Sequence, residues 1–419
     1  MSRRSLTVGV WIGWITVVGL LITACGGVAT KEEGASGEEG GPVKIGAPYP
    51  LSGAWAENGQ NNVQGMQLAI DEINSNGGIE ALDGAQLELA EVDTSSDDPS
   101  QAQSVTTRLI RDERVSALVG SYLSSLTLTS STAAEEEGAP MLTQSFVDEL
   151  TDRGYSTIFQ LPPKSSTFGT ESVNLYAQIA QEQGRPVQTS AVVTSNDAAT
   201  KAQAETVQTQ AEGRNIEVGA FAEYPPGIED ASAVVNQVQS ADPDVIFAGG
   251  PVGDITLIIQ GLRDRGIEAP IVGTGGTGFL VKGLAEGLGQ EVDGLLSLSA
   301  WNEDMVVEGG EAIREASEAY KQTYGEPFMP QEAGESYVAV YLIKEASEQS
   351  QSSDPAAIRD MLAQMSVDSG PQAAMPPGRI AFDDTGMNEY ATPIMIQWQD
   401  QVPKTVWPEE MAAADVRLP

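Results

Sequence analysis

The chain has 419 residues, of which 60 are acidic and 22 basic, giving a formal net charge of −38 and a pI of about 4.1. This charge argues against nucleic-acid binding, which depends on neutralising phosphates, and is typical of a highly soluble surface or a saline habitat. There is no His and only one Cys, which excludes His-based triads, His-ligated metals and an intrachain disulfide. The length predicts two domains, and a hydrophobic content of 41% is typical of globular proteins.

The first 25 residues have the features of an export signal. Arg3 and Arg4 precede an apolar run over 8–24, and Cys25 follows small residues and precedes two glycines. This pattern resembles the bacterial lipoprotein signal, which implies that Cys25 is lipidated and becomes the mature N-terminus. A plain N-terminal anchor helix is the alternative. The paired Arg residues leave the general and the twin-arginine export routes open. Residues 26–42 are rich in Gly and Glu, which predicts a flexible acidic tether.

Strand and helix patterns alternate from residue 43 onward, which predicts parallel sheets with crossover helices. The first half is predicted to have strands at 43–47, 87–92, 117–119, 141–143 and 158–161, with helices at 62–74, from 99 onward and between the strands at 117–119 and 141–143. A second lobe of similar size is predicted from strands at 189–194, 216–221, 245–248, 271–273 and 295–300, with helices at 170–183, 201–212, 231–240 and 254–265. Helices at 311–324, 336–348 and 355–365 follow, and strands at 379–382 and 394–398 could return to both lobes.

The stretch 115–146 is predicted to form a polar shelf at one edge of the first sheet. It contains two short strands, and the chain after each of them carries hydroxyl or amide side chains. Open α/β sheets bind ligands at this edge, outside the carboxyl ends of the strands. A helix start there can hold a ligand carboxylate, although serines at such a position can also act only as helix caps.

Several segments together resemble type I periplasmic binding proteins, in particular the branched-chain amino-acid and amide-type solute-binding lipoproteins of ABC importers. The segments that carry the resemblance are 43–46, 51–53, 58–59, 65–79, 149–155, 336–346, 379–383 and 406–408. The resemblance implies an α/β fold of two Rossmann-like lobes joined by three crossovers. It implies one lobe of 43–162 plus 300–372 and another of 163–299 plus 373–419, which close around a ligand.

The resemblance also implies a function. A protein of this family captures a small organic solute, such as an amino acid, a carboxylate or an amide-like compound, in the cleft between its lobes. It then delivers the solute to the permease and ATPase subunits of an ABC importer. The implied protein is a monomer without a cofactor, exported and held by its lipid at the outer face of the cytoplasmic membrane or in the periplasm. A sensory receptor that partners a membrane signalling protein is the alternative.

The ligand contacts of the family fall on the polar shelf. In the family, a hydroxyl residue after the third strand of the first lobe holds the ligand carboxylate, and here Ser124 and Ser125 match it, with Tyr122 beside them. The next contact follows the fourth strand, where Gln144, Ser145 and Phe146 stand, and which of the three faces the ligand is left open.

Trp55 lies in the predicted loop after the first strand, where the family has a cleft wall, and its ring is expected either to stack on the ligand or to pack against the lobe.

The second lobe departs from the amino-acid binders of the family. Those proteins place an aromatic residue near position 198 and an acidic partner for the ligand ammonium after the strand that ends at Gly273. This chain has Ala198 and Thr274 at these places. A closed cleft without a counter-charge would hold an ammonium at high cost, which favours a carboxylate or amide-like solute. Asp197 could substitute, although its more usual role would be to cap a turn or helix.

Catalysis is not expected from this sequence. The chain has no His, no cofactor fingerprint, and no free nucleophilic Cys once Cys25 is lipidated. Asp383 and Asp384 are adjacent, so their side chains point in different directions rather than forming an acid–base pair. The glycine-rich loop 274–278 lacks the Lys-Ser/Thr ending of a phosphate loop, so its glycines are expected to serve tight turns or a close backbone approach.

Overall fold

A computed structural model describes residues 41–95, 98–275, 278–307 and 310–417. The predicted export signal, its Cys25 and the tether up to residue 40 lie outside the described residues, as do two residues of the glycine-rich loop, Gly276 and Thr277.

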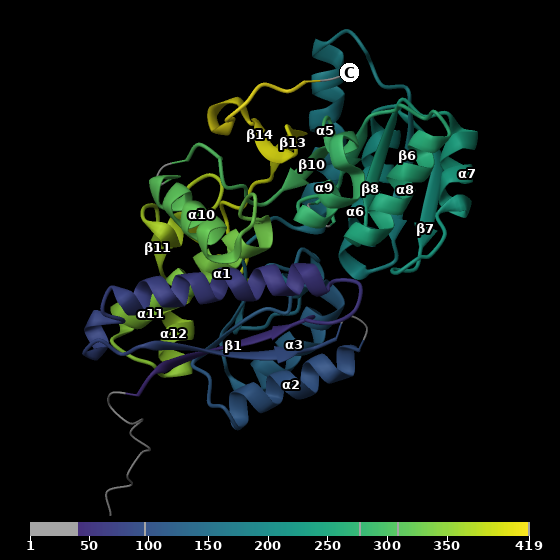
Figure 1. The fold of residues 1–419 in the computed structure, drawn as a ribbon. Helices are drawn as coiled ribbons and strands as arrows, with labels where there is room; N and C mark the ends of the chain where they lie inside the picture. The colour runs from purple at the N-terminus through teal and green to yellow at the C-terminus, as the bar shows by residue number, and fades with distance from the viewer. Residues whose placement is uncertain (1–40, 96–97, 276–277, 308–309, 418–419) are drawn as a thin grey trace, which may run out of the picture. The chain divides into compact units, whose positions relative to one another are not determined.

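The first sheet has the strand order β2-β1-β3-β4-β5, and every pairing in it is parallel. Its strands are β1 (Val43–Tyr49), β2 (Leu87–Asp93), β3 (Ala117–Val119), β4 (Met141–Thr143) and β5 (Ile158–Gln160). The helices within this stretch are α1 (Ala56–Ser75), α2 (Pro99–Arg111), α3 (Ser124–Glu137) and α4 (Glu149–Asp152). Strands β3 and β4 are buried along their whole length, as expected for parallel strands covered on both faces. In Figure 1, α1 and α2 lie on opposite sides of β1.

The second sheet has the strand order β14-β13-β10-β9-β8-β6-β7. Its parallel strands are β6 (Thr189–Ser195), β7 (Glu217–Tyr224), β8 (Val245–Gly249), β9 (Ile271–Gly273) and β10 (Leu296–Ser299), and β13 (Ile394–Gln399) and β14 (Val402–Trp407) join antiparallel. The helices of this part are α5 (Ser165–Glu182), α6 (Ala198–Gly213), α7 (Ser232–Ala241), α8 (Val252–Asp264) and α9 (Lys282–Leu288). Figure 1 shows α6, α7 and α8 alongside β6, β7 and β8.

Three further helices follow β10, of which the first two contact α1 and the third contacts the second. They are α10 (Gly310–Tyr324), α11 (Gln331–Ser350) and α12 (Pro355–Leu362). Helix α11 lies along α1 (Figure 1). A side chain at Gly65 of α1 would place its Cβ 2.1 Å from the Ala333 carbonyl oxygen, so the two helices approach this closely because Gly65 has no Cβ. The chain therefore passes between the two sheets three times: after β5, after β10 and before β13.

Most predicted elements are confirmed, and the differences lie at helix starts and near the C-terminus. Helices α1, α5 and α11 begin at Ala56, Ser165 and Gln331, which is five or six residues earlier than predicted. Their first turns are polar and lack the apolar spacing that predicts a helix, and packing against the rest of the fold stabilises them. The predicted strand at 379–382 shrinks to β12 (Ile380–Ala381), which pairs only with β11 (Ser366–Val367) and does not return to either large sheet.

Candidate ligand-binding site

The polar shelf forms where β3 and β4 end. Ser124 is the first residue of α3, and its hydroxyl shares a hydrogen bond of 2.7 Å with the hydroxyl of Ser145, which follows β4. Both side chains are buried. The N-cap position belongs to Leu123, which makes no side-chain cap, so the Ser124 hydroxyl pairs with Ser145 instead of capping the helix. Ser125, next along the first turn, is half-buried.

Gln144 faces a different set of partners from its neighbour Ser145. Its Oε1 accepts a hydrogen bond from the Tyr49 hydroxyl at 3.0 Å, and its Nε2 donates to the Ser336 hydroxyl at 3.2 Å. Ser336 in turn donates to Asn62 on α1 at 2.7 Å. The Gln144 amide therefore ties the end of β4 to α1 and α11 and has both of its polar atoms engaged within the fold.

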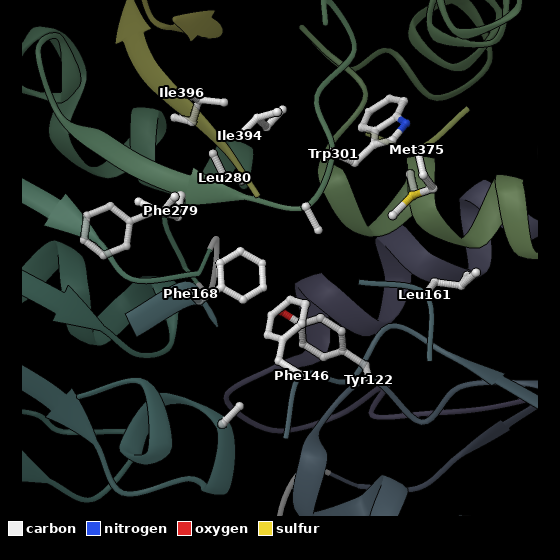
Figure 2. Close-up of a cluster of buried hydrophobic side chains, with 14 of the residues drawn as sticks. Tyr122, Phe146, Leu161, Phe168, Phe279, Leu280, Trp301, Met375, Ile394 and Ile396 are labelled. Atoms are coloured by element: carbon white, nitrogen blue, oxygen red, sulfur yellow. The ribbon is translucent and has the colours of Figure 1, made fainter. Parts of the chain in front are cut away.

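Aromatic side chains also follow the ends of β3 and β4, and Figure 2 shows Tyr122 and Phe146 within a cluster of buried hydrophobic side chains that includes Phe168. The Phe146 ring lies 4.9 Å from the Phe168 ring of α5, measured between centroids. The Trp55 ring meets the Tyr122 ring edge-on at 6.2 Å. Trp55 is 2% exposed and occupies the N-cap position of α1, so the sequence expectation of a long loop around it is wrong, and its ring packs against the first sheet's own Tyr122.

A buried carboxylate on α11 joins this group, although the sequence analysis did not single it out. Glu332 is 0% exposed, and its Oε1 accepts hydrogen bonds from Asn58 Nδ2 at 2.6 Å and from the Tyr122 hydroxyl at 3.2 Å. Its Oε2 has no hydrogen-bond partner. Burial raises the pKa of Glu332 to about 7 despite the two donors on Oε1.

Glu335 lies one helical turn further along α11 and is also fully buried. Neither of its carboxylate oxygens has a partner at hydrogen-bonding geometry. Burial and the nearby charge of Glu332 both raise the pKa of Glu335 well above its usual range, and the neighbouring Gln331 side chain offsets this only in part. Two buried acids thus stand on one face of α11 without a basic partner among the ion pairs of the described residues.

The end of β6 in the second sheet carries a third carboxylate, Asp197, whose bonding is complete. Its Oδ1 accepts from the N–H groups of Ala199 and Thr200 at 3.2 and 3.3 Å, which caps α6. Its Oδ2 accepts from the hydroxyls of Ser195 and Thr200, each at 2.5 Å. Asp197 is therefore placed as the helix cap that its sequence context favours.

Thr274 follows β9 and is 3% exposed. Its hydroxyl donates to Gln203 Oε1 on α6 at 3.0 Å, while Gln203 Nε2 has no partner. Gln203 is thus a second buried polar group at this sheet edge that the sequence analysis did not identify.

Tyr122 is affected by carboxylates from both parts of the molecule. Burial raises the pKa of its hydroxyl well above the usual range, and the charges of Glu332, Glu335 and Asp197 add to this effect, so Asp197 lies close enough to act on it. Helix α3 also contacts α6. Of the predicted ligand-site residues, Trp55 packs against Tyr122, Ser124 bonds to Ser145, and Phe146 packs against Phe168. Gln144, Asp197 and Thr274 bond to other partners, and Ser125 lies in the first turn of α3.

The signal that could have located Glu332 is weak. Pro330 precedes two glutamates spaced three apart, which is compatible with a helix start. Their burial depends on α1, which lies more than 250 residues earlier along the chain, as the separation of 274 positions between Asn58 and Glu332 shows. Among the described residues no group of acidic or Cys side chains is arranged to hold a metal ion, and no helix is long and apolar enough to cross a membrane.

Comparison with known proteins agrees with the class that this fold defines, the two-sheet α/β binding proteins. The chain belongs to the periplasmic binding protein family, whose model matches residues 42–397. It is 29% identical over 398 residues to Leu/Ile/Val-binding protein homolog 7 of Brucella abortus (strain 2308), covering 94% of this chain and 98% of the relative.

Solved structures show the same fold. The branched-chain amino acid transporter substrate binding protein LivJ of Streptococcus pneumoniae, in complex with isoleucine, superposes with a TM-score of 0.75 at 25% identity, covering 90% of this chain and 100% of that one. A solute binding protein of an ABC transporter from R. palustris, in complex with benzoate, superposes with a TM-score of 0.74 at 17% identity, covering 90% and 99%. The second likeness concerns the fold alone.

Proposed function

We propose that this chain captures a small organic solute at the strand ends of its two sheets and delivers it to the permease and ATPase of an ABC importer. The observation that carries the proposal is the buried hydroxyl pair of Ser124 and Ser145 beside Tyr122, at the carboxyl ends of parallel strands. Ligands of open α/β sheets bind at this edge. Two hydroxyls that hydrogen-bond to each other can still donate to a carboxylate or carbonyl oxygen, because one donor of the pair remains free.

The relatives support a small organic ligand. One of them is named as a Leu/Ile/Val-binding homolog, one structure holds isoleucine, and one holds benzoate. From these relatives we infer that the solute of this chain is an amino acid, a carboxylate or an amide-like compound. Catalysis forms no part of the proposal, because the side chains gathered at the site contain neither a nucleophile paired with a base nor a cofactor-binding motif.

The proposed ligand-binding lobes are 43–162 plus 300–372 and 163–299 plus 373–419. Two observations support these boundaries: α10 and α11 contact α1, and β13 and β14 extend the second sheet. We propose that the lobes close around the ligand by a hinge motion at the three passages of the chain. We further propose an exported monomer held at the outer face of the cytoplasmic membrane, or in the periplasm, through lipid on Cys25 and the acidic tether of residues 26–42.

A thermal-shift panel tests the proposal. The chain is unfolded and refolded to remove any solute that copurified, and its melting temperature is measured with amino acids, aromatic acids, short amides and polyols. A true ligand at a hundred times its Kd stabilises the folded state by about 2.7 kcal/mol, which gives a rise of a few degrees. A melting temperature that no solute of any class raises would contradict the proposed function.

A further inference from the structure

The residues of the proposed binding site are closed off from solvent. Tyr122, Ser124 and Ser145 are all buried. A solute therefore reaches or leaves them only when the first proposed lobe (43–162 plus 300–372) moves relative to the second (163–299 plus 373–419). Contacts between the two lobes that lie outside the site oppose this opening.

Glu57, in the first turn of α1, contacts the start of α9 in the other lobe. Its Oε1 accepts a hydrogen bond from the Gly283 N–H at 3.0 Å, although the two residues are 226 positions apart. The approach is close, because a Cβ on Gly283 would lie 2.6 Å from Glu57 Oε2. Val281, at the N-cap of α9, makes no side-chain cap, so the Gly283 N–H is bound by a residue of the first lobe.

The segment 325–330, which joins α10 to α11, also contacts the second lobe. Both carboxylate oxygens of Glu326 lie 2.9 Å from Lys282 Nζ on α9. The Phe328 ring meets the Trp398 ring of β13 edge-on, with the two centroids 5.6 Å apart, and both rings are buried. This segment belongs to the first lobe through its flanking helices and is joined to the second by an ion pair and an aromatic contact.

Lys282 offsets a group of acids that come from both lobes. Among the described residues that line the crevice of about 330 Å³ between α1 and α9, it is the only basic one, and the acidic ones are Glu57, Glu286 and Glu326. Lys282 Nζ also lies 3.7 Å from Glu286, and the charge of Glu57 acts on it. Without Lys282, two carboxylates of the first lobe would face one of the second without compensation, and their repulsion would favour opening.

We propose, on the basis of the solute-binding function above, that Glu57, Lys282, Glu326 and Phe328 form a latch that holds the lobes closed and sets the rate at which the solute leaves. The contacts of the latch are made with groups other than the hydroxyls of the proposed site. The latch stabilises the closed form as a whole, so it changes the dissociation of every solute by the same factor. A residue that contacted the solute would instead change the preference between solutes.

The Lys282→Met variant tests the latch. The refolded full chain is loaded with isoleucine, phenylalanine, benzoate or propionamide, and with any other solute that raised its melting temperature in the panel above, and dissociation rates are measured by stopped flow. Loss of the cation is expected to raise each rate about 10-fold, between the effects of exposed and buried charge pairs, and to keep the order of affinities. The ratio of variant to wild-type rate is expected to fall toward one between about 0.05 and 0.5 M NaCl, because salt screens both the attraction and the repulsion.

Two further variants complete the experiment. Glu326→Gln removes the charge of the partner and keeps its shape, and it is expected to raise the rates in the same direction but less, because Lys282 still has Glu286 beside it. Lys344→Met is the matched control. Lys344 and Glu348 of α11 are 3.1 Å apart with side chains 27% and 17% exposed, against 38% and 19% for Lys282 and Glu326, but both belong to one lobe. Its rates are expected to equal those of the wild-type chain.

Unchanged dissociation rates in both Lys282→Met and Glu326→Gln would overturn the latch and leave the proposed function standing. A change confined to one class of solute would also overturn it, because it would place Lys282 in contact with the solute. If no solute binds here or raises the melting temperature in the panel, the proposed function fails, and the latch fails with it.

Discussion

The carboxylates of Asp197 and Glu332 differ in how completely the fold satisfies their hydrogen-bonding capacity. Asp197, beside the second sheet, accepts four hydrogen bonds from backbone and hydroxyl donors. Glu332, beside the first, is more deeply buried and has an oxygen with none. The number of acids near a site therefore says little about recognition, because a carboxylate that caps a helix is already satisfied. Burial without full hydrogen bonding is the property that separates Glu332 from Asp197.

The largest expected effect comes from separating the two helices that create the Glu332 environment. In Gly65→Ala the new Cβ would meet the Ala333 backbone of α11, so one helix must shift. We expect a loss of about 3 kcal/mol in the free energy of unfolding, at the upper end for overpacking, together with weaker solute binding. Gly253→Ala on α8 is the control, since nothing lies within 4 Å of its added Cβ. Chemical denaturation measures the free energy of unfolding of both variants. An unchanged value for Gly65→Ala would show that the close contact between α1 and α11 is not rigid.

The pH dependence of the unliganded chain tests the burial of Glu332 directly. Its pKa of about 7 in the folded state lies above the ordinary value of 4.5, so the folded state binds the proton more tightly than the unfolded state. The resulting stability is full below pH 4.5 and is lost as the pH rises through 7. The loss is at most about 1.4 kcal/mol per pH unit, or about 3 kcal/mol over this window. Glu57, Glu335 and Tyr122 face the same group and also titrate, so the quantity to measure is the difference in unfolding free energy between the wild-type chain and Glu332→Gln at pH 5 and pH 8.

The wild-type chain should lose that stability relative to Glu332→Gln between the two pH values. If the unfolding free energies of the two proteins changed equally between pH 5 and pH 8, Glu332 would be in contact with water or a cation in the unliganded state. Glu332 and Asp197 would then not differ in how well their carboxylates are satisfied.

Ser124→Ala probes the hydroxyl pair of the proposed site. Loss of the Ser124 hydroxyl should weaken solute binding by about 1–3 kcal/mol, and it should also lower the melting temperature, because the buried Ser145 hydroxyl loses its partner. Ser130→Ala on the same helix removes a buried hydroxyl that bonds to Ser121 at 2.8 Å, and it serves as the control for stability without binding. Should Ser124→Ala lower the melting temperature and leave the affinity intact, the hydroxyl pair would be a structural contact.

The smallest effect on binding is expected at Asp197. In Asp197→Ala the start of α6 loses its cap, which should lower the free energy of unfolding by about 1 kcal/mol and leave solute affinity nearly unchanged. Asp354→Ala, which removes the comparable cap of α12, should cost a similar amount. A loss of solute affinity in Asp197→Ala as large as that expected for Ser124→Ala would show that this carboxylate contacts the ligand as well as capping α6.

Much of the fold could be predicted because the strands are short, apolar and bounded by turn residues. Strands β3, β4 and β9 have the predicted bounds. Strand β14 was missed because Pro403 interrupts its pattern, and the structure shows why the proline is tolerated: β14 is the edge strand of its sheet. The first turn of α11 was missed because its residues are polar and include Gly334, and it is held in place by contact with α1.

The residues of the candidate site also differ in how far local sequence predicts them. The shelf of Ser124 and Ser145 follows from local sequence, because each residue lies within a few positions of the end of a predictable strand. Glu332 does not, because a glutamate near a helix start usually faces water, and only the packing of α11 on α1 buries it. Chain order does not place Asn58, Tyr122 and Glu332 together, although hydrogen bonds of 2.6 and 3.2 Å join them.

A crystal structure of the chain with its tightest-binding solute tests the central claim most directly. The account predicts one solute per chain, in contact with Tyr122 and the hydroxyls of Ser124 and Ser145. A solute seated elsewhere would contradict it, for example in the crevice of about 330 Å³ that Glu57, Lys282 and Glu326 help to line.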